Sequence, residues 1–143
     1  MRSWIPLTIV SLIMISGQPY VTTNNKSFNM ENNTYPVRLI NVSINKPASE
    51  VYRFASNPEN FPKWMDFVKS IKKDGDIWIG ETNLGPFRFK MVPKNEFGII
   101  DHHVTIPSGE VVFNPMRVME NNKGSEFIFT LFRMPGRSDK EFE

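Results

Sequence analysis

Six short segments in which apolar and polar residues alternate, each followed by turn-forming residues, occupy the chain from Phe67 to Met134. An alternation with period two turns one face of a segment toward a core and is typical of β-strands. The Gly, Asn, Asp and Pro residues between the segments suit hairpins that join antiparallel neighbours. The pattern predicts a meander with strands at residues 67–73, 77–82, 85–92, 98–104, 110–119 and 125–134.

One further strand and two short helices are expected before this meander. Residues 37–44 have the composition of a strand. A helix over 48–55 opens after Pro47, which suits a helix start, and places its apolar side chains on one face. A second short helix, at residues 59–64, lies close to prolines and carries two aromatic rings.

A last helix is expected to begin at Asp139. Ser138 and Glu141 have the spacing of a capping box, in which each side chain satisfies the other residue's backbone amide. The sequence given ends after barely one turn of this helix, and a helix that short is not stable by itself in water. We therefore expect a truncated C-terminal helix whose covering role passes to another part of the chain, a second copy, a ligand or a membrane surface.

Several segments resemble the START-like superfamily, also called SRPBCC. The segment NKPASEVY at 45–52 is similar to its first strand-to-helix junction, and NPENFPKW at 57–64 is similar to its second-helix motif. Within the superfamily, the chain most resembles the polyketide cyclase/dehydrase and lipid-transport family. Its members carry segments similar to DHHV at 101–104, NPMRV at 114–118 and FTLF at 129–132.

The resemblance covers residues 37–143 and implies an α+β, helix-grip fold. In this fold a curved antiparallel sheet, with two short helices after its first strand, encloses an apolar cavity that a C-terminal helix closes. Residues 1–36 then form a separate signal-like apolar segment and a polar linker. The resemblance is specific for the fold but not for an activity, because the family includes cyclases, lipid carriers and proteins of other activities.

The apolar run from Ile5 to Ile15 follows Arg2 and resembles the hydrophobic region of a secretory leader, being short for a membrane span. No good cleavage site follows it. A real leader would make the protein secreted, periplasmic or tethered to a membrane through this run. Translation from Met30 would instead leave the domain in the cytoplasm.

Charge and composition exclude several classes of function. The formal net charge is only +2, and the basic residues are interspersed with acidic ones, so no nucleic-acid surface is expected. The chain has no Cys, which excludes disulfides, thiolate nucleophiles and Cys-based zinc sites. No residues stand at metal-ligand spacing and no phosphate-binding glycine loop appears, so neither a metal nor a cofactor is predicted.

Aromatic residues supply the candidate ligand-binding wall, and twelve Phe is a high number for this length. Residues of equal parity on two of the predicted strands form apolar stripes. Two Trp residues can extend the same wall. In a helix-grip fold such a face serves both as core and as ligand pocket. The candidate ligand-binding residues of this wall are Trp64, Trp78, Phe87, Phe89, Met91, Phe127 and Phe129.

Two polar residues are candidates for orienting a ligand. Neighbouring strand residues point to opposite faces, so only one of His102 and His103 can face the cavity. His102 shares parity with two apolar residues and is the inward candidate, either as a satisfied core histidine or as a general acid/base. Arg117 faces inward if Val111 and Met119 do, and it would then bind a carboxylate or enolate oxygen. The opposite apolar set of that strand would place it in a surface ion pair instead.

Three hypotheses about function remain open from the sequence. The first is binding or carriage of a small hydrophobic or amphipathic ligand, such as a lipid, polyketide or aromatic metabolite. The second is a cyclase/dehydrase-like enzyme in which His102 acts on an enolisable carbonyl. The third is a degenerate or truncated member without a ligand. Separately, a second copy of the chain is one of the covers expected for the exposed face of the sheet.

Overall fold

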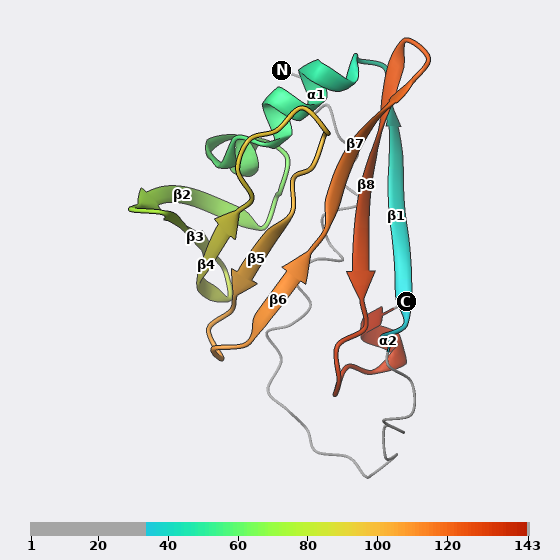
Figure 1. Cartoon of the computed structure of the whole chain (residues 1–143). Helices are drawn as coiled ribbons and strands as arrows, with labels where there is room; N and C mark the ends of the chain where they lie inside the picture. Colours follow the sequence, from blue (N-terminus) through green and yellow to red (C-terminus); the bar gives the residue numbers. More distant parts are fainter. Residues whose placement is uncertain (1–33, 143) are drawn as a thin grey trace.

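The computed structural model describes residues 34–142, and the leader and the alternative start at Met30 lie outside this range. Eleven elements follow one another along the chain (Figure 1). They are β1 (Val37–Ile44), α1 (Ala48–Ala55), the 3₁₀-helix η2 (Pro58–Lys63), β2 (Val68–Asp74), β3 (Ile77–Thr82), β4 (Gly85–Met91), β5 (His102–Thr105), β6 (Val111–Asn114), β7 (Met116–Asn121), β8 (Gly124–Phe132) and α2 (Asp139–Phe142).

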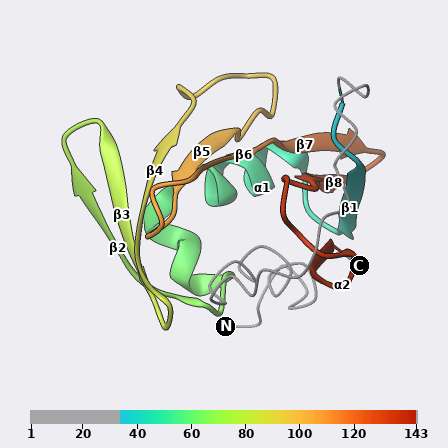
Figure 2. The same ribbon diagram turned by 90° about the horizontal axis from the view of Figure 1, so that it is seen from below.

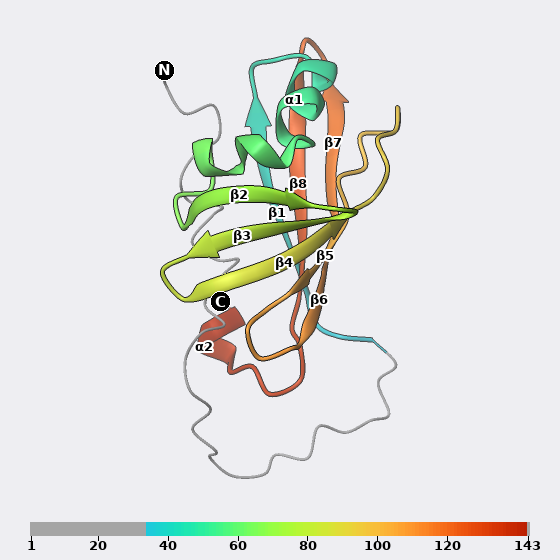
Figure 3. The ribbon, with the colours of Figure 1, turned by 90° about the vertical axis from the view of Figure 1, so that its left-hand side faces the viewer.

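All the strand pairs are antiparallel, and they form two sheets that meet at one line. The first sheet has the order β1-β8-β7 and the second the order β2-β3-β4-β5-β6. Pro115 separates β6 from β7, and a bridge between Ile99 and Arg117 joins the sheets beside it. Figure 3 shows β2, β3 and β4 running across the direction of β1, β7 and β8. The sheets together therefore form one strongly curved surface.

The inner side of this surface is covered by the helices between β1 and β2. Figure 2 shows the strands as an arc with α1 and η2 inside it. Helix α1 begins after Pro47, and it buries Val51 and Ala55 where it packs on β7 and β8. The 3₁₀-helix η2 packs on β2 and buries Phe61. Both helices thus turn apolar side chains toward the concave face, as their sequence spacing predicts.

The structure confirms the predicted order of strands and corrects two of them. The strand expected at 98–104 is regular only from His102, because Gly98 adopts a positive φ of 70° and the chain loops before it. The strand expected at 110–119 is divided into β6 and β7, because Pro115 has no N–H to donate to a ladder. Both departures lie where the two sheets meet.

Two polar contacts hold the segment after β8 against the body of the domain, and a third lies within the segment. Helix α2 begins at Asp139, as the capping box predicts. Arg133 pairs with Asp139 at 2.5 Å, and Arg137 pairs with Glu110 at 3.3 Å. Arg38 on β1 donates to the carbonyl oxygen of Phe142 at 2.7 Å. In the part of the chain that the structure describes, no helix is long and apolar enough to cross a membrane.

Candidate functional site

A group of nearly parallel aromatic rings centred on Phe89 lies at the concave face of the second sheet, and one of the rings, Phe61, comes from η2. The Phe89 ring lies 5.3 Å from Phe61, 5.6 Å from Phe87 and 6.4 Å from Trp78, measured between centroids. The interplanar angles are 20°, 24° and 20°, so each pair is stacked. Offset stacking of this kind is the favoured arrangement of aromatic pairs. We call these four residues the ring stack.

Gly80 on β3 makes room for one member of the ring stack. Gly80 is the cross-strand partner of Phe87, and the Phe87 ring lies over it. A Cβ atom at position 80 would be 2.2 Å from Cζ of that ring, which is far inside van der Waals contact. The absence of a side chain at Gly80 is therefore what allows Phe87 to lie across the sheet and stack on Phe89.

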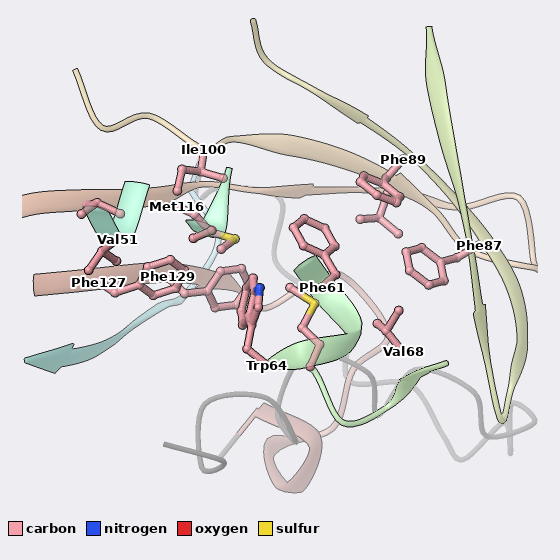
Figure 4. Close-up of a cluster of buried hydrophobic side chains, with 14 of the residues drawn as sticks. Val51, Phe61, Trp64, Val68, Phe87, Phe89, Ile100, Met116, Phe127 and Phe129 are labelled. Atoms are coloured by element: carbon pink, nitrogen blue, oxygen red, sulfur yellow. The ribbon is translucent and has the colours of Figure 1, made fainter. Parts of the chain in front are cut away.

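Trp64 connects the ring stack to the first sheet (Figure 4). Its indole lies edge-on to Phe61 at 5.5 Å and edge-on to Phe127 of β8 at 5.7 Å. Phe127 and Phe129 are fully buried on the inner face of β8. The two apolar stripes predicted from the sequence thus belong to one continuous buried cluster.

The structure places all of the predicted aromatic wall in or beside this cluster. Five of its members are buried, whereas Trp78 and Met91 are partly buried and pack against its edge. Sequence reasoning did not assign Phe61, Ile100 and Met116 to the wall, although all three are among its most buried residues. The proximity of Phe61 to Trp64 on one helical turn was the signal that could have found it.

His102 faces inward, as its parity with Ile100 and Val104 predicts. Its side chain is buried within 6.4 Å of the Phe61 and Phe89 rings, measured between centroids. Nδ1 lies 3.1 Å from the carbonyl oxygen of Ile100, which can only accept, so Nδ1 carries the proton. Nε2 then accepts from the side-chain amide of Asn114 at 3.4 Å. Burial lowers the pKa of His102 below 6.5, and this outweighs the opposing effects of the Ile100 hydrogen bond and the Asp101 charge.

The lowered pKa of His102 predicts a pH-dependent stability. Below pH 6.5 the unfolded chain binds a proton at this position before the folded domain does, so the free energy of unfolding falls as the pH decreases. We expect a loss of up to about 1.4 kcal/mol per pH unit from this group alone. Urea denaturation between pH 8 and pH 5 measures it. His102→Gln should flatten this part of the profile, and His103→Gln, on the exposed face, should leave it in place; equal profiles for both variants would contradict the assignment.

Arg117 does not join the inner face, which corrects its assignment as a ligand-binding residue. Its neighbours Met116 and Val118 are buried, and strand alternation therefore turns Arg117 outward. Its guanidinium forms an ion pair with Asp101, whose carboxylate also accepts from the amide of Met116 at 2.9 Å. Arg117 thus helps to hold the two sheets together where they meet.

Two buried polar atoms of the cluster have no partner among the described residues. They are the indole nitrogen Nε1 of Trp64 and the hydroxyl oxygen of Ser125. Ser125 lies two residues before Phe127 on the inner face of β8. Among the side chains that the structure describes, no three His, Asp or Glu residues are grouped so that they could hold a metal ion. The described site is therefore an aromatic surface with a few isolated polar groups.

Comparison with solved structures defines the class of fold. An uncharacterized protein from Bacillus thuringiensis matches with a TM-score of 0.62 and 15% identity over 74% of this chain and 84% of that chain. Ara h 8.0201 matches at 0.54 and 14% identity over 72% and 80%, and DynU16, of the dynemicin biosynthetic locus, at 0.56 and 14% over 73% and 39%. No protein-family model and no curated protein matches the chain. With the element order described above, these likenesses identify an α+β, helix-grip fold.

Proposed function

We propose that this domain binds a small hydrophobic or aromatic molecule against the concave face of its sheet. The observation that carries the proposal is the ring stack, whose rings lie nearly parallel and which is buried except at its Trp78 end, where it is only partly buried. A planar apolar molecule gains about 25 cal/mol for each Å² of apolar surface that it buries on such a face. The resemblance to the polyketide cyclase/dehydrase and lipid-transport family supports the same class of ligand.

The edge of the ring stack also has a cationic side chain near it. Nζ of Lys73 lies 5.6 Å from the centroid of the Trp78 ring, on the neighbouring strand. A lysine stem covers aromatic surface while its ammonium group remains in water. This residue can move aside at little cost, because an exposed cation–π contact is worth only about 0.5–1 kcal/mol. We propose this edge as the place where a ligand meets the stack.

A neutral fluorescent probe, N-phenyl-1-naphthylamine, tests the proposal by titration of the full chain. We expect saturable binding with enhanced emission, and about 2- to 10-fold weaker binding by Trp78→Ala, because one stacking partner is worth roughly 0.5–1.5 kcal/mol. Phe97→Ala is the matched control, since this ring is 76% exposed on the loop between β4 and β5. Absence of binding to the folded wild-type chain would refute the proposal.

An enzyme of the cyclase/dehydrase kind is the second candidate, and one observation favours it. His102 is a neutral imidazole among aromatic rings, and only a long contact of 3.4 Å occupies its Nε2 lone pair. Such a nitrogen can remove a proton next to a bound carbonyl group. Deuterium incorporation from D₂O into the α-position of a bound aryl ketone, lost in His102→Gln, would establish this activity. Binding without exchange would leave the domain as a carrier.

A further inference from the structure

The indole N–H of Trp64 is a buried donor for which the described residues supply no acceptor. The Trp64 side chain is 3% exposed, and Nε1 has no hydrogen-bond partner among residues 34–142. Buried indole N–H groups usually find a partner, because an unmade hydrogen bond retains the cost of removing the group from water. The position of this donor therefore indicates where an acceptor belongs.

The donor lies within the aromatic cluster itself. The Trp64 ring is placed edge-on between Phe61 and Phe127. In Figure 4 the indole projects from the end of η2 into the cluster. The hydroxyl of Ser125, on the same face of β8 as Phe127, is also without a partner. Both unsatisfied polar atoms thus belong to the part of the cluster that is next to β8.

We infer that the N–H of Trp64 donates a hydrogen bond to a neutral acceptor oxygen of the bound molecule, as an aromatic ketone would provide. This inference rests on the proposed function and specifies its ligand class. An acceptor is required because the indole nitrogen can only donate. The oxygen is neutral because the buried side chains that the structure describes include no Lys or Arg, so a carboxylate placed there would be buried without a counter-charge.

The aromatic part of the ligand follows from the surroundings of this donor. Trp64 is in edge contact with Phe61, and Phe61 is stacked on Phe89. A molecule whose carbonyl oxygen reaches Nε1 is therefore within reach of ring faces that favour a second planar group. Aliphatic lipids lack this geometry. An aryl ketone combines the two features in one small molecule.

A pair of near-isosteric compounds tests the hydrogen bond. 2-Acetylnaphthalene carries a carbonyl oxygen where 2-isopropenylnaphthalene carries a CH₂ group, and their rings are identical. We expect the wild-type chain to prefer the ketone, and we expect Trp64→Phe to reduce the ketone-to-alkene affinity ratio by about 3- to 10-fold, the value of one net hydrogen bond. Trp78→Phe is the matched control and should retain the wild-type ratio. Isothermal titration calorimetry of the three full-length chains measures the ratios.

The possible outcomes separate this inference from the proposed function. If both compounds bind and the ratio is the same in Trp64→Phe, the ligand-binding function stands and the inference about Trp64 is overturned. If neither compound binds to the folded wild-type chain, both fail. Should Trp64→Phe not fold, the ¹⁵N-labelled wild-type chain decides: a downfield shift of the Trp64 indole proton with the ketone and none with the alkene supports the inference, and equal shifts overturn it.

Discussion

Replacement of Phe89 by Ala is expected to lower the free energy of unfolding by about 3–5 kcal/mol, the usual cost of truncating a buried Phe. The Phe89 side chain is 2% exposed and is the ring that the other three members of the ring stack contact. The cavity left by the missing Phe89 ring would lie between η2 and strands β3 and β4. The strands are held in place by their hydrogen-bonded ladder, and the Phe61 ring of η2 lies on the other side, so the surrounding elements would not collapse fully into it. The whole free energy of unfolding of a small domain is about 5–15 kcal/mol, so this single change removes a large part of its stability.

Urea denaturation followed by far-UV circular dichroism measures this loss, and Phe97→Ala serves as the control for removing a Phe. Phe97 is 76% exposed, so its truncation should change the free energy of unfolding by less than about 0.5 kcal/mol. Similar values for the two variants would contradict the assignment of Phe89 to the centre of the core.

Replacement of Gly98 by Ala is expected to cost about 2–5 kcal/mol, from two effects that act at the same residue. Gly98 has a φ of 70°, and an L-residue in the left-handed region costs about 1–2 kcal/mol. A Cβ at this position would also lie 2.1 Å from the carbonyl oxygen of Val118, and forced overpacking adds about 1–3 kcal/mol. The approach is close because the amide of Val118 donates to the carbonyl of Gly98 at 2.9 Å, across the junction of the two sheets.

Gly109→Ala separates the two effects. Gly109 has a φ of 86°, but no atom lies within 4 Å of a Cβ built there. This variant should therefore show the backbone cost alone, and the difference between the two variants in thermal or urea denaturation measures the contact with β7. Equal losses would show that Val118 moves aside freely, and the close approach of Gly98 would then have no structural importance.

The alternation of side chains carried most of the information about the fold. It predicted the sequential strands and the inward faces of Phe87, Phe89, Phe127 and Phe129, because an antiparallel sheet with one buried face imposes a period of two. It failed for Arg117, where both faces of the strand were equally apolar in sequence. The outward orientation is fixed by the ion pair of Arg117 with the Asp101 carboxylate, which lies 16 positions earlier in the chain.

The candidate site could be predicted as a surface but not as a set of contacts. The orientation of His102 followed from Ile100 and Val104, but its partner Asn114 comes from β6 and depends on strand register. Trp64 was named as part of the wall from its motif. Its unpartnered N–H could not be foreseen, because the absence of an acceptor is a property of the whole three-dimensional neighbourhood and not of any local pattern.

Pro115 divides what would be one long strand into β6 and β7, and the sheet bends at this position. Polar residues lie on both faces of the sheet near this bend. His102 and Asn114 point inward, and Asp101 and Arg117 form their ion pair beside them. The ion pair where the two sheets meet is thus a close neighbour, along the chain, of the two buried polar side chains. If the domain binds a ligand as we propose, a substitution at His102 or Asn114 would therefore act on the curvature of the sheet as well as on the ligand.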